Sequence, residues 1–128
     1  MSLLVWGVPA GATPSFGRVI EVGESLAPEG SQYLGDEWEG NEWCFSDGCP
    51  TVLRYYAVKD AQAVTKAVTS TLERDGWKPA RLRQGAALCK GGYNVRIEGA
   101  GKVPTHFDVA PLPAGMEGVR MRVGARCE

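Results

Sequence analysis

The segment from Thr51 to Trp77 constrains the fold more strongly than any other part of the chain. Its first eight residues, TVLRYYAV, are mostly β-branched or aromatic and place bulky side chains on both faces, as is typical of a central strand. Arg54 lies on one of these faces, beside Tyr56. Pro50 stands at the entrance, where a missing backbone N–H is tolerated. The pattern predicts a buried strand over residues 51–58.

A helix is predicted directly after this strand, over about residues 60–75. Asp60 is a favourable N-cap, and Gly76 suits the left-handed position that ends a helix. The apolar residues between them recur at the 3.6-residue period. Three of these side chains are therefore expected to be buried against a sheet: Val64, Val68 and Leu72.

A β-meander is predicted for the C-terminal half. ALCKGGYNVRIEG (87–99) is typical of a hairpin whose turn is Gly91-Gly92. THFDV (105–109) and GVRMRVGARC (118–127) continue the alternation of apolar and polar residues. Three half-polar strands beside one main helix indicate an α+β fold, whose antiparallel sheet is wet on one face and covered by the helix on the other.

The N-terminal part carries weaker patterns. LLVWGV (3–8) and RVIEV (18–22) are apolar enough for short strands. Residues 23–47 show little periodicity, many carboxylates and turn residues throughout. This composition predicts a long surface loop.

Composition excludes several classes of protein. The chain is 44% hydrophobic and 23% charged, as in an ordinary globular protein, so we expect a single domain over residues 1–128. Met1–Leu3 and Glu128 resemble residues added by cloning. No apolar run is long enough for a transmembrane segment. The cations are scattered, without a basic run or an aromatic RNA-binding motif, so no nucleic acid is expected as a partner.

Charge is distributed unevenly along the chain. Residues 1–60 carry nine carboxylates and three cations, a net charge of −6, whereas residues 61–128 carry eleven cations and six carboxylates, a net charge of +5. A bipolar surface that meets a partner is one interpretation. We favour the other, in which the two halves lie together and neutralise each other, because surface charge is a weak signal of either fold or partner.

Four cysteines are spaced as C-x4-C followed by two long gaps. This spacing lacks the second close pair of a zinc ribbon, and the chain has one histidine, so neither a metal nor another cofactor is expected. An even count among many turn residues favours two disulfides, Cys44–Cys49 and Cys89–Cys127, and an oxidising compartment. Four reduced, buried thiols are the alternative. The second bridge requires a break in strand alternation, for which a bulge at Gly124 is a candidate.

The acidic segment before the central strand holds three aromatic residues that are candidates for binding: Tyr33, Trp38 and Trp43. Exposed aromatic residues within a charged rim are typical of a protein-binding patch, and sugar stacking on the tryptophans is a second option. In a third interpretation, both tryptophans fold over the sheet as lids. The carboxylates lack the D-x-D-x-D-G order of a calcium loop, so no metal site is predicted.

His106 and Asp108 resemble half of a catalytic triad, because they stand two residues apart on the polar side of a strand. No serine or cysteine nucleophile stands nearby in a recognisable motif. The leading hypothesis is a non-catalytic domain that binds another protein or a cell-envelope component. The alternative is a small hydrolase or transferase whose site includes His106, Asp108 and acidic-loop carboxylates.

Residues 44–97 resemble small uncharacterised extracytoplasmic domains of high-GC Gram-positive bacteria. The resemblance is carried by C-x4-C-P-x3-R-Y-Y (44–56), by a helix ending L-E-R-D-G-W (72–77), and by a cysteine before G-G-Y-N-V. A composition rich in Ala, Gly and Val, with nine Arg to five Lys, is similar to that of such proteins. The resemblance implies secretion, or tethering through a membrane segment missing from this chain, and it implies no activity.

Overall fold

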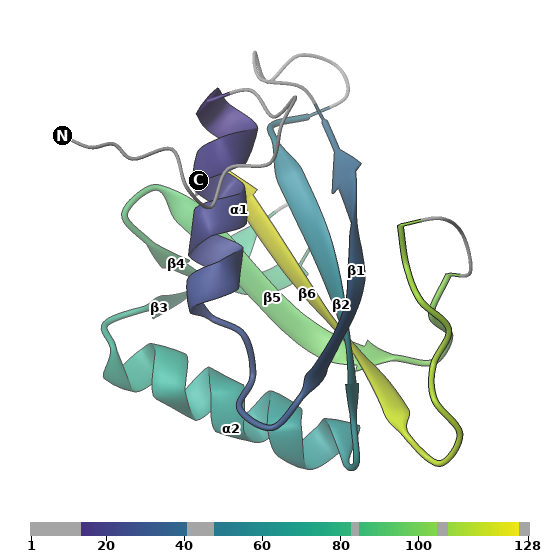
Figure 1. Ribbon diagram of the computed structural model, residues 1–128. Coiled ribbons are helices and arrows are strands. Elements are labelled where there is room, and N and C mark those ends of the chain that lie inside the picture. The colour runs from purple at the N-terminus through teal and green to yellow at the C-terminus, as the bar shows by residue number, and fades with distance from the viewer. Residues whose placement is uncertain (1–13, 41–47, 83–84, 105–107, 126–128) are drawn as a thin grey trace, which may run out of the picture.

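The structure, a computed structural model, describes residues 14–40, 48–82, 85–104 and 108–125. These residues form two helices and one six-stranded sheet, which confirms the predicted α+β class (Figure 1). The elements follow the chain as α1 (Pro14–Ser25), β1 (Gln32–Glu39), β2 (Thr51–Val58), α2 (Ala61–Arg74), β3 (Lys78–Leu82), β4 (Gly85–Lys90), β5 (Tyr93–Ala100) and β6 (Glu117–Ala125).

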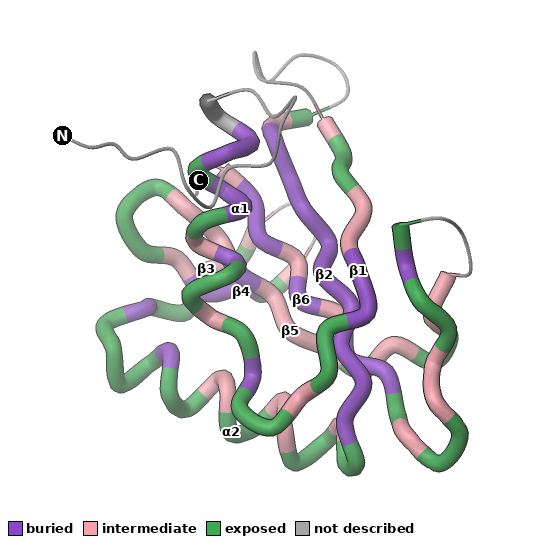
Figure 2. The backbone as a smooth tube through the Cα atoms, in the orientation of Figure 1, coloured by how far each residue is buried: buried purple, intermediate pink, exposed green. Residues whose placement is uncertain are grey.

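The sheet has the strand order β1-β2-β6-β5-β4-β3, and every neighbouring pair is antiparallel. Strands β3 to β6 form a meander, and the turn between β4 and β5 is the predicted pair Gly91-Gly92, flanked by Lys90 and Tyr93. β6 also pairs with β2, so it joins the meander to the hairpin-like pair β1–β2. The predicted central strand is β2, which is buried along its whole length (Figure 2).

α2 begins and ends where the sequence predicts. The Asp60 side chain accepts a hydrogen bond from the Ala63 backbone N–H, at 3.1 Å, and so caps the helix. At the other end Gly76 has a φ of 100°, in the left-handed region. The Trp77 N–H then donates to the Leu72 carbonyl at 3.0 Å, which is the hydrogen bond of a Schellman motif.

Both helices cover the same face of the sheet (Figure 1). α1 packs on β2 and β6, whereas α2 packs on β5 and β6. The expectation of one main helix was therefore incomplete, because α1 supplies much of the core. The buried apolar residues that the two helices contribute to this core are Phe16, Val19, Ile20 and Leu72.

α2 is less deeply buried than its periodicity predicts. Leu72 is 2% exposed, as expected, but Val64 and Val68 are only half-buried. The reason is that α1 and the chain after it leave a groove along this side of α2 instead of closing on it. Within the described residues, no helix is long and apolar enough to cross a membrane.

The second face of the sheet was expected to be exposed to solvent, but part of it is buried. Leu34, Leu53 and Tyr55 form a second buried cluster there with Val109. Three half-buried apolar side chains from the chain before β6 cover this cluster: Val103, Leu112 and Met116. Both faces of β2 are therefore packed, which explains why this strand has bulk on both sides.

The prediction of a strand over residues 18–22 was wrong, because these residues lie in α1. Phe16, Val19, Ile20 and Gly23 follow the i, i+3, i+4, i+7 spacing of a helix face, and all four are buried. Residues 18–22 hold three apolar residues among five, a pattern that fits a strand equally well, so this short window was ambiguous.

The prediction of a loop over residues 23–47 was also wrong in part, because β1 lies within it. The register of β1 against β2 shifts between Tyr33 and Gly35, so the strand does not show a clean alternation. β1 is an edge strand, and its carboxylates are the charged residues that protect such edges from pairing with other chains. β3, at the opposite edge, was likewise not foreseen.

Two further predictions fall partly outside the described residues. The apolar run 3–8 lies outside them, as does most of 105–109. In that second segment the structure shows an isolated antiparallel bridge between Val109 and Gly35. The Ala110 N–H also donates to the Leu34 carbonyl at 2.8 Å, so this part of the chain lies along the edge of β1.

Neither of the described cysteines, Cys49 and Cys89, is a free thiol. Cys44 and Cys127 lie outside the described residues, so the pairing stays a prediction. No bulge occurs at Gly124, because pairing runs through it without a shift to Ala125. Gly124 instead leaves room for the Asn94 side chain, because a Cβ at this position would come within 2.9 Å of it.

Candidate functional site

Two large hydrophobic side chains remain exposed among the described residues, and both belong to β1. Tyr33 is 45% exposed and Trp38 is 41% exposed. Their partners on β2, Tyr56 and Val52, both point into the core under the helices. Tyr33 and Trp38 therefore project from the face of the sheet that carries α1 and α2.

A β-bulge brings these two side chains onto one face. Tyr33 and Trp38 are five positions apart, an odd spacing that a regular strand would direct to opposite faces. The register shift makes Leu34 the extra residue, so the alternation resets after it. Asp36 then lies between the two aromatic residues, opposite Arg54 of β2. We call Tyr33, Asp36 and Trp38 the β1 aromatic surface.

Trp38 leans against the first turn of α1. Its ring stacks on the Phe16 ring, with centroids 5.2 Å apart and 15° between the planes. Phe16 is itself buried in the core. The indole is thus held flat against the protein, with part of its area left to solvent.

Tyr33 is backed by a buried cation. Arg54 is only 6% exposed, and its guanidinium carbon lies 4.4 Å from the centroid of the Tyr33 ring. The Arg54 Nε donates to Tyr56 Oη at 2.8 Å. Gly23 of α1 makes room for the arginine stem, because a Cβ there would lie 2.8 Å from Arg54 Cδ. The two phenols and α1 therefore hold this arginine in place beneath β1.

The ionisation of this cluster is stable at neutral pH. Burial raises the pKa of Tyr33, and the hydrogen bond that Tyr33 Oη donates to the Asp36 carboxylate raises it further. Burial also raises the pKa of Tyr56, against the influence of Arg54. Burial alone lowers the pKa of Arg54, but its hydrogen bond to Tyr56 and the nearby Asp36 carboxylate raise it above the usual value. The surface therefore presents the protonated phenol of Tyr33 over a charged guanidinium.

The other residues singled out by sequence are not assembled into a site. Trp43 and His106 lie outside the described residues. Asp108 is exposed, and its backbone carbonyl crowds Gly35, where a Cβ would lie 1.8 Å away. In the described part of the chain, no group of three or more His, Cys, Asp or Glu side chains is arranged to hold a metal ion.

Sequence reasoning did not assign a role to Arg54. Its alternation with Tyr56 placed it on a buried face, which was the available signal. A lone cation on the buried face of a central strand requires compensation, here from aromatic rings and a phenol oxygen.

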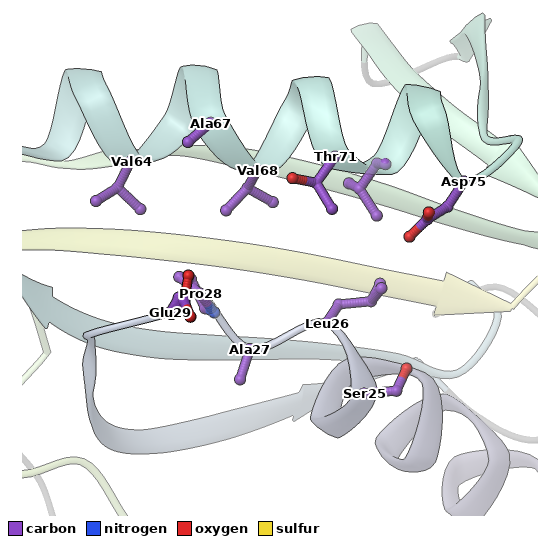
Figure 3. A pocket seen from close by; sticks show the side chains of 11 residues that line it. Ser25, Leu26, Ala27, Pro28, Glu29, Val64, Ala67, Val68, Thr71 and Asp75 are labelled. Atoms are coloured by element: carbon purple, nitrogen blue, oxygen red, sulfur yellow. The ribbon is translucent and has the colours of Figure 1, made fainter.

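A groove of about 350 Å³ lies between α2 and the end of α1 with the loop that follows it (Figure 3). Its α2 wall includes Val64, Val68 and Leu72, and its opposite wall includes Leu26 and Pro28. The β1 aromatic surface does not contribute to the lining.

Comparison with known proteins adds no relative. No family model matches this chain, and neither a curated protein nor a solved structure resembles it significantly. The resemblance to extracytoplasmic domains of high-GC Gram-positive bacteria therefore stays a prediction.

Proposed function

We propose that this chain is a non-catalytic binding domain that contacts another protein or a cell-envelope component through the β1 aromatic surface. One observation carries the proposal. The two large hydrophobic side chains that remain exposed in the described residues, Tyr33 and Trp38, lie on one face of one edge strand. Rigid aromatic anchors surrounded by a polar rim are typical of binding surfaces.

The support beneath the rings strengthens this proposal. Phe16 backs Trp38 and Arg54 backs Tyr33, so neither ring needs to become ordered when a ligand arrives. Side-chain ordering is one of the costs of association, so a preformed surface binds more tightly at equal area.

The spacing of the rings limits the ligand. The β2 partners of Tyr33 and Trp38 are residues 56 and 52, so the two aromatic residues are roughly 14 Å apart along the strand. A ligand that touches both must be extended, such as a polypeptide segment or an oligosaccharide. Asp36 between them is placed to accept hydrogen bonds from either kind of ligand.

Binding to purified cell-wall glycans and to solubilised envelope proteins tests this proposal. For whichever ligand the parent chain binds, Trp38→Ala is expected to weaken affinity roughly 30-fold, the scale of a 2 kcal/mol anchor. Its free energy of unfolding should fall by about 1–2 kcal/mol, because the Trp38 ring is only partly buried.

Two matched variants make the result decisive. Trp38→Phe keeps a ring stacked on Phe16 and should retain most of the affinity. Lys66→Ala changes an exposed residue on α2, away from β1, and should leave binding unchanged. Unaltered affinity in a variant that combines Tyr33→Ala and Trp38→Ala would place the binding site elsewhere.

We also propose an extracytoplasmic location and two disulfides, Cys44–Cys49 and Cys89–Cys127. The finding that neither Cys49 nor Cys89 is a free thiol supports them. A thiol assay in denaturant without reductant should detect no reactive cysteine, and peptide mapping should recover these two pairs. Four reactive thiols would contradict both the disulfides and the location.

A further inference from the structure

α2 leaves much of its apolar stripe uncovered. Of its fourteen residues only Leu72 is buried, whereas Val64 and Val68 are half-buried. An amphipathic helix on a globular domain ordinarily buries this stripe against its neighbours. Here the stripe forms one wall of the groove between α2 and the loop after α1 (Figure 3).

The groove has the size and length of a small-molecule site. Its volume of about 350 Å³ lies at the lower end of the range for ligand pockets. Along α2 it runs from Val64 to Asp75, which is on the order of 16 Å at the rise of an α-helix. The walls facing each other are Val64 and Val68 on one side and Leu26 and Pro28 on the other.

The charged side chains that line the groove are carboxylates. Glu29 lies at one end of the groove, opposite Val64, and Asp75 lies at the other end (Figure 3). Among the described residues that line the groove, none is cationic. Lys90 approaches from outside the lining, where its Nζ donates to the main-chain carbonyl of Asp75 at 2.6 Å. That contact leaves the Glu29 end as the more negative of the two.

We propose that this groove binds an elongated cationic amphiphile, with its apolar chain between α2 and the loop after α1 and its cationic head group beside Glu29. Apolar walls favour an alkyl or aryl body, and a carboxylate at the end selects a cationic head over an anionic one. This site is separate from the β1 aromatic surface and does not depend on the function proposed for it.

The probe for the test is dodecyltrimethylammonium, titrated below its micelle concentration into the full chain, with dodecyl sulfate and dodecyl maltoside as matched ligands. Heteronuclear NMR should show saturable shifts at Val64, Val68 and Leu26 for the cationic ligand, while the circular dichroism spectrum stays unchanged. Glu29→Gln should weaken its affinity roughly two- to fivefold, the scale of one partly exposed ion pair.

Two α2 variants separate groove binding from general detergent binding. Ala67→Phe adds a ring at a groove-lining, exposed position and should abolish the shifts. Ser70→Phe adds the same ring to the same helix outside the groove and should leave binding intact. Trp38→Ala, which removes one of the two rings of the β1 aromatic surface, should also leave binding intact.

Three results would overturn the proposal. Equal affinity for dodecyl sulfate or dodecyl maltoside would show that charge does not select the ligand. Shifts centred on Trp38, or spread over the whole surface, would indicate adventitious adsorption. Absence of any saturable shift up to the micelle concentration would show that the groove does not bind this class of molecule.

Discussion

Gly23→Ala is a sharp test of how Arg54 is accommodated. Gly23 is buried in α1, where a Cβ would lie 2.8 Å from Arg54 Cδ and 3.5 Å from Val123 Cγ2. Arg54 has little freedom to withdraw, because Tyr56 accepts a hydrogen bond from its Nε and Tyr33 covers its guanidinium. The added methyl group therefore has to displace a side chain that is held at its far end.

Two opposing effects determine how much Gly23→Ala changes the free energy of unfolding. Replacing glycine by alanine within a helix ordinarily stabilises it by about 1 kcal/mol. Forcing an extra carbon into a packed site ordinarily costs about 1–3 kcal/mol. We therefore expect Gly23→Ala to lower the free energy of unfolding by about 0–2 kcal/mol, although helix propensity alone predicts a gain.

Urea unfolding, followed by tryptophan fluorescence, measures the effect of Gly23→Ala in the parent chain and in the variants Arg54→Ala and Arg54→Met. With Arg54→Ala the obstructing stem is gone, so Gly23→Ala should now stabilise by up to about 1 kcal/mol. With Arg54→Met the charge is removed but an atom remains near the Cδ position, so Gly23→Ala should still destabilise. Stabilisation of the parent chain by Gly23→Ala, or the same change in every background, would refute the steric explanation.

Three further predictions concern the core, one turn and one tyrosine. Leu72→Ala should cost about 2–5 kcal/mol in urea unfolding, whereas Val68→Ala should cost clearly less, because Val68 borders the groove; equal costs would contradict the half-buried stripe. Gly76→Ala should cost about 1–2 kcal/mol, because its φ of 100° is strained for alanine; no measurable loss would contradict the Schellman motif. Burial, and then the hydrogen bond to Glu37, raise the pKa of Tyr55 to about 12, above its unfolded value of about 10. This contribution to stability is complete below pH 10 and is lost as the pH rises toward 12, so the alkaline decline of stability should be shallower in Tyr55→Phe; an identical decline would contradict it.

The segment from β2 to Trp77 could be predicted from sequence because its signals are local. Asp60 and Gly76 mark the helix ends through backbone geometry that depends on a few neighbours. The depth of α2 could not be predicted, because periodicity shows which face turns inward but not how closely another element approaches. Val64 and Val68 therefore lie on the face of α2 that was predicted to turn inward, but they are half-buried instead of buried.

The predictions for the N-terminal part, residues 18–47, failed for a different reason. A bulge shifts the alternation of β1, and residues 18–22 of α1, with three apolar residues among five, fit either a strand or a helix. For the same reason, only part of the candidate site could be predicted from sequence. Tyr33 and Trp38 could be chosen from their surroundings in sequence, but their supports, Phe16 and Arg54, required the position of α1 to be known.

The place of β6 in the sheet has a consequence for vectorial synthesis. Among the helices and strands of the described residues, β6 comes last in sequence, yet it lies between β2 and β5. Until residues 117–125 have left the ribosome, the nascent chain can form only two unjoined sheets, β1–β2 and β3–β4–β5. Each of them then presents an open, hydrogen-bonding edge, and the β2 edge belongs to a strand that is wholly buried in the finished fold. Co-translational folding of this domain therefore ends with the insertion of a single strand, and a nascent chain stalled before that step is the form most in need of a chaperone.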